Sequence, residues 1–183
     1  MTRVLGFAGS LRKDSYNRAL LRAARELAAA EGLEVEIFEI DGIPPYNQDD
    51  ESAMPAVVRD FKSRIEQADA LLLVTPEFNY SVSGVLKNAI DWASRPYGTN
   101  SFEEKPVAIM GATVGTLGTS RAQYHLRQML VYVNAYPLNR PEVMVSAAAD
   151  KFMDGELVDE HTRQKVREQL AALAAWAKRL HPA

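Results

Sequence analysis

Short strand-like runs alternate with helical patterns along the whole chain, and this alternation limits the possible folds more than any other feature. Five runs that are apolar, or that alternate apolar and polar residues, predict strands at 4–8, 34–38, 70–74, 107–110 and 143–145. Helical spacing predicts helices at 15–30, 55–68, 83–93, 117–133 and from about residue 158 onward. Repeated strand–helix units predict an α/β protein with a five-stranded parallel sheet and helices on both of its faces.

The length and composition are those of one globular domain, which we expect to span residues 1–183. A formal net charge of -3 gives no basic excess for neutralising phosphates, so we expect no nucleic-acid or membrane-surface partner. No apolar run approaches the ~20 residues that span a bilayer, and no signal-peptide pattern is present. We therefore expect a cytoplasmic protein.

The chain contains no cysteine, which excludes disulfides, thiolate nucleophiles, zinc–thiolate sites and iron–sulfur clusters. The histidines His125, His161 and His181 are scattered without metal-ligand spacing, so we expect no metal site. Ser10 lacks the G-x-S-x-G pattern of hydrolases. Any redox chemistry therefore needs a bound organic cofactor.

Three loops that follow predicted strands carry the candidate functional residues. In open parallel α/β sheets, ligands bind outside the carboxyl ends of the strands, at the point where the strand order reverses. We name these the first loop (9–17), the second loop (75–84) and the third loop (111–118). Function is predicted at the sheet edge where they meet.

The first loop has two hydroxyls, an amide, a guanidinium and an ammonium close to the start of a helix: Ser10, Arg12, Lys13, Ser15 and Asn17. The N-terminus of a helix has free N–H groups and about half a positive charge, so it attracts phosphate. The alternative is plain helix capping by Ser15 or Asn17, but capping needs one such residue and this loop has five. The loop therefore predicts a phosphate site.

The second loop combines a rigid proline with aromatic and polar groups: Pro76, Glu77, Phe78, Asn79 and Tyr80. A flat heteroaromatic ring with a polar edge suits such a loop, and the alternative is an aromatic loop that only covers the end of the sheet. The third loop contains three glycines, which let a backbone approach a ligand closely. The alternative there is a tight turn, which needs one or two glycines.

Two familiar nucleotide motifs are missing from these loops. The chain has no G-x-x-x-x-G-K-[ST] spacing and no complete G-x-G-x-x-G fingerprint, although Gly6 and Gly9 match it in part. Asp41 follows the second predicted strand, where it could hold a ribose. A Rossmann dehydrogenase therefore remains an alternative.

The loops resemble those of the NADPH-dependent FMN reductases. The resemblance is carried by the run Gly9-Ser10-Leu11-Arg12 with Ser15 and Asn17, and by residues 75–81, 84–92 and 94–96. Residues 121–128 also resemble the bacterial quinone and chromate reductase branch. The resemblance covers nearly the whole chain and implies a flavodoxin-like three-layer sandwich, non-covalently bound FMN, and NADPH or NADH as co-substrate.

The same resemblance implies a set of cofactor-binding residues. The phosphate would be held by Ser10, Arg12, Ser15 and Asn17, the ring bordered by Pro76, Glu77, Phe78 and Asn79, and its other side lined by Thr113 and Gly115. Phe78 stands where many members have tyrosine, and Ser83 stands where the pattern often has proline. The first departure removes a hydroxyl but keeps a stacking surface, so FMN binding is still expected.

The implied activity is an NAD(P)H-dependent reductase that passes electrons through FMN to a quinone, free flavin or a similar small acceptor, with ping-pong kinetics. Because the flavin carries the chemistry, we assign no catalytic residue. The main alternative is a flavodoxin-type electron carrier, although such carriers are usually more acidic than -3. A scaffold that has lost its flavin is a third possibility. Arg12, Lys13, Arg95 and Arg121 could each meet a 2′-phosphate, so the choice between NADPH and NADH stays open.

Two predicted helices have apolar residues over a wider arc than the ~100° stripe that burial on one face needs. These residues are Val85, Leu86, Ala89, Ile90 and Trp92 in one, and Leu126, Met129, Leu130, Val131 and Tyr132 in the other. We therefore predict a homodimer or homotetramer, which agrees with the resemblance. Glu77, Arg121 and Tyr124 are expected to contact the partner copy.

Overall fold

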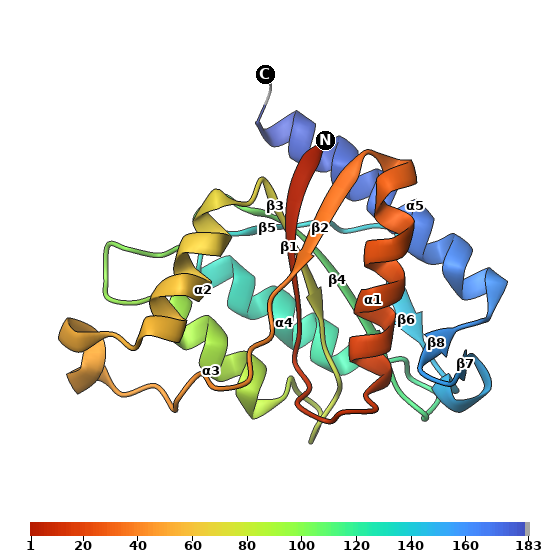
Figure 1. Ribbon diagram of the computed structural model, residues 1–183, viewed down its shortest axis with the longest axis horizontal. Helices are drawn as coiled ribbons and strands as arrows, with labels where there is room; N and C mark the ends of the chain where they lie inside the picture. The colour runs from red at the N-terminus through yellow and green to blue at the C-terminus, as the bar shows by residue number, and fades with distance from the viewer. Residues whose placement is uncertain (182–183) are drawn as a thin grey trace.

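A parallel sheet forms the middle of three layers in the computed structural model, which describes residues 1–181 (Figure 1). The strand order across the sheet is β2 (Leu33–Ile37), β1 (Thr2–Ala8), β3 (Ala70–Val74), β4 (Pro106–Ala112) and then β5 (Tyr136–Pro137). β6 (Val143–Val145) pairs with β4 on the same side as β5. This order is that of flavodoxin-like folds, so the predicted fold class is confirmed and the Rossmann alternative is wrong.

Helices cover both faces of the sheet, as predicted. One face is covered by α1 (Tyr16–Ala28) and α5 (Glu160–Leu180), and the other by α2 (Ala56–Gln67), α3 (Gly84–Ala93) and α4 (Ser120–Tyr132). None of these helices is both long and apolar enough to cross a membrane, within the part of the chain that the structure describes.

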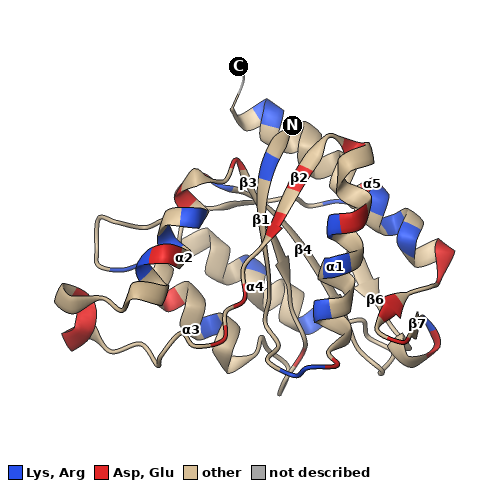
Figure 2. Cartoon of the chain, in the orientation of Figure 1, with Lys and Arg blue, Asp and Glu red and all other residues tan. Residues whose placement is uncertain are grey.

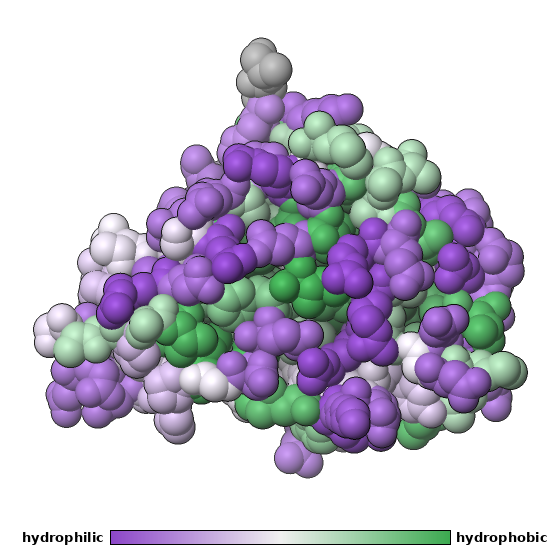
Figure 3. All heavy atoms as spheres, in the orientation of Figure 1, coloured by the Kyte–Doolittle hydropathy of each residue, from purple (hydrophilic) through white to green (hydrophobic). Residues whose placement is uncertain are grey.

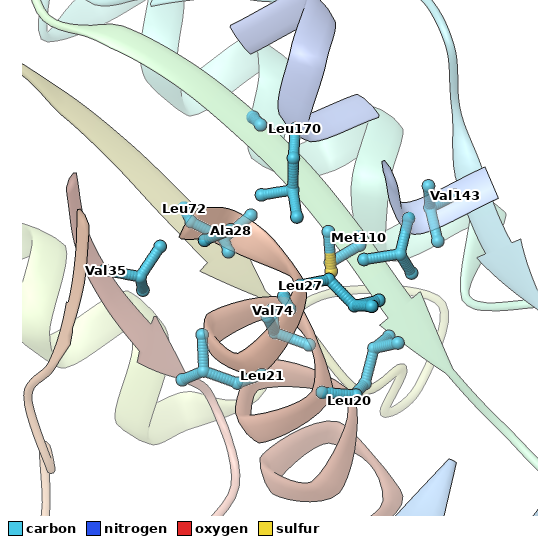
Figure 4. Close-up of a cluster of buried hydrophobic side chains, with 14 of the residues drawn as sticks. Leu20, Leu21, Leu27, Ala28, Val35, Leu72, Val74, Met110, Val143 and Leu170 are labelled. Atoms are coloured by element: carbon cyan, nitrogen blue, oxygen red, sulfur yellow. The ribbon is translucent and has the colours of Figure 1, made fainter. Parts of the chain in front are cut away.

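The central strand β3 shows why the sheet is buried on both sides. Leu72 and Val74 point into the core beneath α1 and α5, and Figure 4 shows them close to side chains of both helices. Leu71 and Leu73 point into the second core, beneath α2, α3 and α4. Successive side chains of a strand face opposite sides, so a strand buried on both faces must be apolar throughout.

The fifth strand position is split, which the sequence prediction missed. β5 pairs with the first residues of β4 and β6 with the last, and only β6 was predicted. Gln169 of α5 bridges the interruption, because its Nε2 donates to the carbonyls of Ile109 at 2.9 Å and Pro141 at 2.8 Å. β5 has two residues, one of them Pro137, so it shows no apolar run that a pattern search detects.

Two other differences lie near the third loop. The predicted helix 117–133 begins only at Ser120, because Gly118 and Thr119 have left-handed backbone conformations with φ of 56° and 64°. A short turn, η3 (Ala148–Asp150), and a small antiparallel hairpin of β7 (Phe152–Met153) and β8 (Glu156–Leu157) were not predicted. The remaining short helices are η1 (Ala29–Glu31), which ends at Gly32, and η2 (Gln48–Ala53).

Candidate functional site

The three loops meet at the carboxyl edge of the sheet, as the sequence predicts. Backbone hydrogen bonds join their starting points: Gly9 N donates to Val74 O at 2.8 Å, and Thr75 N donates to Met110 O at 2.9 Å. β1, β3 and β4 are parallel neighbours, so their carboxyl ends reach the same edge. This edge lies at the bottom of Figure 1.

Ser15 is the N-cap of α1. Its buried Oγ accepts from the backbone N–H groups of Asn17 at 3.2 Å and Arg18 at 3.4 Å. The capping alternative considered from the sequence therefore describes what the Ser15 hydroxyl does in this structure. Ser10 is half-buried and Arg12 is exposed, so these two side chains remain available to a ligand.

Asn17 joins the first loop to the end of β4. Its Nδ2 donates to Ala112 O at 3.0 Å, and its Oδ1 accepts from Ala112 N at 2.9 Å. Both ends of this buried amide are thus engaged with one residue. The side chain of Asn17 fixes the spacing between the first and third loops, and its backbone N–H lies in the first turn of α1.

The first loop carries two cations, Arg12 and Lys13, and one carboxylate, Asp14, so its formal charge is positive. Among residues 1–181, Arg18 pairs with Glu39 at 3.0 Å, whereas Arg12 and Lys13 form no ion pair. Figure 2 shows basic residues on the loop between β1 and α1. Together with the N-terminus of α1, these cations favour an anion at this edge.

The second loop makes a tight turn at the same edge. Phe78 and Ser81 exchange two backbone hydrogen bonds of 2.9 Å, and the residues between them, Asn79 and Tyr80, have φ of 50° and 68°. Two successive positive φ values are typical of a type I′ turn. Pro76 before the turn is buried, whereas Phe78 is 58% exposed and presents a flat apolar surface.

An ion pair fixes the second loop to α4. The Glu77 carboxylate accepts from the guanidinium of Arg121 and raises the pKa of that group further above its ordinary value. The Arg121 guanidinium also lies 3.8 Å from the ring centroid of Tyr80, and Ser81 Oγ lies 3.0 Å from His125 Nδ1. The Glu77 side chain therefore links the second loop to α4.

The glycines of the third loop have different roles. A Cβ on Gly111 would collide with Thr119 Oγ1, and a Cβ on Gly118 would lie 2.6 Å from the backbone carbon of Met144. A Cβ on Gly115 would meet only Thr113 Oγ1, at 3.8 Å. The prediction that all three glycines admit a ligand is therefore too broad, because only Gly115 borders open space.

A hollow of about 280 Å³ lies between the second and third loops. Its lining combines predicted site residues with neighbours that the sequence did not single out: Glu77, Thr113, Gly115, Thr116, Leu117, Thr119 and Arg121. Thr119 was missed because its left-handed backbone and buried position depend on packing against Gly111. No local sequence signal indicates that packing.

Three larger hollows lie elsewhere, and their charged side chains have partners. In one of about 430 Å³, Arg95 pairs with Glu51 at 2.9 Å and Asp91 with Lys87 at 2.7 Å. The remaining two have neutralised charges as well. One of about 750 Å³, at the opposite edge of the sheet, contains the Arg3–Asp69 pair and Lys105, whose Nζ donates to backbone carbonyls at the end of α2. The other, of about 390 Å³, lies beside β1 and β2, where Figure 3 shows hydrophobic atoms bordered by hydrophilic ones. Arg64 at its rim pairs with Glu36 and Asp60. We therefore take the carboxyl edge as the candidate site.

The chain is similar to known reductases. A family model described as NADPH-dependent FMN reductase matches residues 2–150. The chain belongs to this family. It is 51% identical over 180 residues to an NAD(P)H-dependent FMN reductase of Pseudomonas aeruginosa, covering 97% of this chain and 96% of the relative. It is 43% identical to a 2-hydroxy-1,4-benzoquinone reductase of a Burkholderia species, with 93% of each chain covered.

Solved structures give the same result. The flavoenzyme NAD(P)H:(acceptor) oxidoreductase FerB from Paracoccus denitrificans matches with a TM-score of 0.90 and 37% identity, covering 98% of each chain. A flavodoxin-like protein of the WrbA type from Agrobacterium tumefaciens matches with a TM-score of 0.65 at 14% identity, which supports the fold alone. The predicted family and the predicted class of NAD(P)H-dependent reductase are confirmed by these relatives. The individual cofactor-binding residues stay predictions.

Proposed function

We propose that this chain binds FMN non-covalently at the carboxyl edge of the sheet and passes electrons from NADPH or NADH to a quinone or a similar small acceptor. The observation that carries the proposal is the unneutralised charge of the first loop, directly beside the open backbone of the third loop. Family membership and the names of its relatives support the same activity. The proposed site residues remain those predicted from the sequence, with the Asn17 side chain placing the first and third loops instead of contacting the phosphate.

The residues present fit an anionic, flat cofactor. Arg12 and Ser10 offer donors for a phosphate, and charge-assisted hydrogen bonds are the stronger kind. The positive end of the α1 dipole lies beside them and favours an anion. Gly115 has no side chain, and the space where its Cβ would lie is bordered only by Thr113 Oγ1, so the edge of a flat ring can approach the backbone there. Thr113 Oγ1 accepts from Gly115 N at 3.3 Å, which leaves the hydroxyl hydrogen free to donate to a ring carbonyl.

When bound, FMN supplies the hydride acceptance and electron donation that side chains lack. The chain itself binds and orients: the first loop holds the phosphate, and the second and third loops border the ring. The exposed ring of Phe78 provides a flat surface at the open side, where the nicotinamide and the acceptor would bind in turn. No proton-transferring side chain is assigned.

Steady-state oxidation of NADPH and of NADH by the FMN-loaded protein, with a quinone as acceptor, tests this proposal. Turnover with either nucleotide supports the reductase, and the ratio of the two kcat/KM values settles the nucleotide preference. Bound FMN without turnover favours the electron-carrier alternative. Protein that gains no visible absorbance from added FMN contradicts the proposal.

We also propose that the chain forms a homodimer or homotetramer through α4. The wide apolar arc of α3 does not support a partner, because Trp92 is buried within the chain and its Nε1 donates to Pro44 O at 2.8 Å. On α4, however, Val131 is 75% and Tyr132 77% exposed, so this part of the predicted arc is uncovered. A monomeric mass at micromolar concentration would contradict the oligomer.

A further inference from the structure

The β7–β8 hairpin lies just beyond the residues that the family model matches, and it packs against the helix that follows the first loop. Phe152 is 8% exposed, and its ring centroid lies 5.3 Å from that of Tyr16 in the first turn of α1. The carbonyl of Gly155, at the tip of the hairpin, accepts from Arg22 Nη2 at 3.1 Å. Figure 1 shows β7 and β8 beside the lower, N-terminal half of α1.

Tyr16 connects this hairpin to the charged group of the first loop. The Arg12 guanidinium carbon lies 5.7 Å from the centroid of the Tyr16 ring, within the range of a cation–π interaction. Tyr16 is half-buried, and one side of its ring is fixed by Phe152. A continuous series of side-chain contacts therefore runs from Phe152 through Tyr16 to Arg12.

The segment that leads into the hairpin also supports the third loop. Ala148 N donates to Thr113 O at 3.0 Å, and Ala147 N donates to Gly115 O at 3.1 Å. In the opposite direction, Thr113 N donates to Val145 O at 2.9 Å. One stretch of chain, residues 145–157, thus contacts the first and the third of the three loops that border the proposed site.

We propose that Tyr16 and Phe152 are positioning residues that hold the Arg12 guanidinium ready for the phosphate end of the cofactor. This inference rests on the proposed function, because it presumes that FMN is the ligand. An exposed arginine loses rotamer freedom when it binds an anion, and a guanidinium already held over a ring loses less. Phe152 acts through Tyr16, and Tyr16 acts through Arg12.

The affinity ratio of FMN to riboflavin isolates this effect, because riboflavin has the same ring system without the phosphate. Flavin fluorescence titrations give both dissociation constants for the wild type and for each variant. Tyr16→Leu and Phe152→Leu are expected to lower the preference for FMN by about two- to fivefold, the range of one cation–π interaction. Tyr16→Phe keeps the ring and should keep the ratio.

Two controls separate positioning from a general loss of structure. Met153→Ala changes an exposed side chain of the same hairpin and should leave the ratio unchanged. A variant that only loosens the hairpin should weaken FMN and riboflavin binding by the same factor. If Tyr16→Leu and Phe152→Leu both show such equal losses, the inference is overturned. In the Arg12→Ala background, Tyr16→Leu should have no further effect on the ratio, because the group that it positions is gone.

The outcomes distinguish this inference from the proposed function. A wild-type protein that binds no FMN overturns the proposed function and this inference with it. A wild type that prefers FMN, with an unchanged preference in Tyr16→Leu, overturns the inference alone. A preference that falls in Tyr16→Leu and Phe152→Leu, and is retained in Tyr16→Phe, supports it.

Discussion

The first and third loops lie side by side at the carboxyl edge, joined by the two hydrogen bonds between Asn17 and Ala112. In the first loop, the Arg12 and Lys13 side chains stay exposed and without carboxylate partners among residues 1–181. In the third loop, Gly111 and Gly118 are enclosed by packing, and only Gly115 borders open space. The first loop therefore presents exposed cations, whereas the third loop is a tightly packed backbone that is open only at Gly115.

This difference shows that glycines and unpaired cations in a loop sequence are not equally good indicators of a ligand site. Glycines beside a site can be required by the protein's own packing, so their number does not measure how closely a ligand approaches. An exposed cation without a carboxylate partner, next to a helix N-terminus, is more specific, because packing does not account for it. The variants below separate the two roles.

The largest effect is expected at Gly111. Gly111→Ala places a Cβ against Thr119 Oγ1 and against the carbonyl of Thr75, and should lower the free energy of unfolding by about 3 kcal/mol or more. Gly115→Ala is the matched control, with an expected change below about 0.5 kcal/mol. Urea denaturation of both variants measures the contrast. Equal losses would contradict the assignment of Gly111 to packing and of Gly115 to the site.

Asn17, which links the two loops, should come next. Asn17→Leu removes both hydrogen bonds to Ala112 and leaves a buried peptide unsatisfied, at a cost of about 2 to 3 kcal/mol in unfolding free energy. Asn47→Leu is the control, since the exposed Asn47 accepts one hydrogen bond, from Asp49 N at 3.2 Å. If both variants lose the same small amount, Asn17 does not fix the spacing of the loops.

Arg12 should affect binding without affecting stability. Arg12→Ala removes a charge-assisted contact to the phosphate and should weaken FMN binding about ten- to a hundredfold, which corresponds to about 1.5 to 3 kcal/mol. Arg25→Ala, at the exposed far end of α1, should leave the affinity unchanged. Calorimetric titration with FMN measures both. An unchanged affinity in Arg12→Ala would place the phosphate elsewhere.

A smaller effect is expected from pH. The second ionisation of a phosphate monoester has a pKa of about 6, so lowering the pH from about 7.5 to 5 removes negative charge from FMN. FMN binding should weaken about three- to tenfold over this range. Riboflavin has no phosphate and would contact only the second and third loops, so its binding should stay constant. If the affinities for FMN and riboflavin fall by the same factor, the first loop does not bind the phosphate.

The sheet, its main helices and the meeting of the three loops at one sheet edge could be predicted because each rests on a local pattern. The apolar run at 70–74, for example, gives a strand with the predicted bounds. The split fifth position could not be predicted, since β5 has two residues and its gap is bridged by Gln169, more than 25 positions along the chain. The roles of Gly111 and Ser15 depend on which atoms pack around them, which residue types alone do not show.

The most direct test of the proposed function is the visible absorbance of the FMN-loaded protein without oxygen, followed through two additions. NADPH or NADH should bleach the absorbance of the bound flavin, and a quinone added afterwards should restore it. That pair of changes would show electrons entering and leaving through a cofactor held by this chain. Bound FMN that neither nucleotide bleaches, or a protein that retains no FMN, would contradict the proposed reductase.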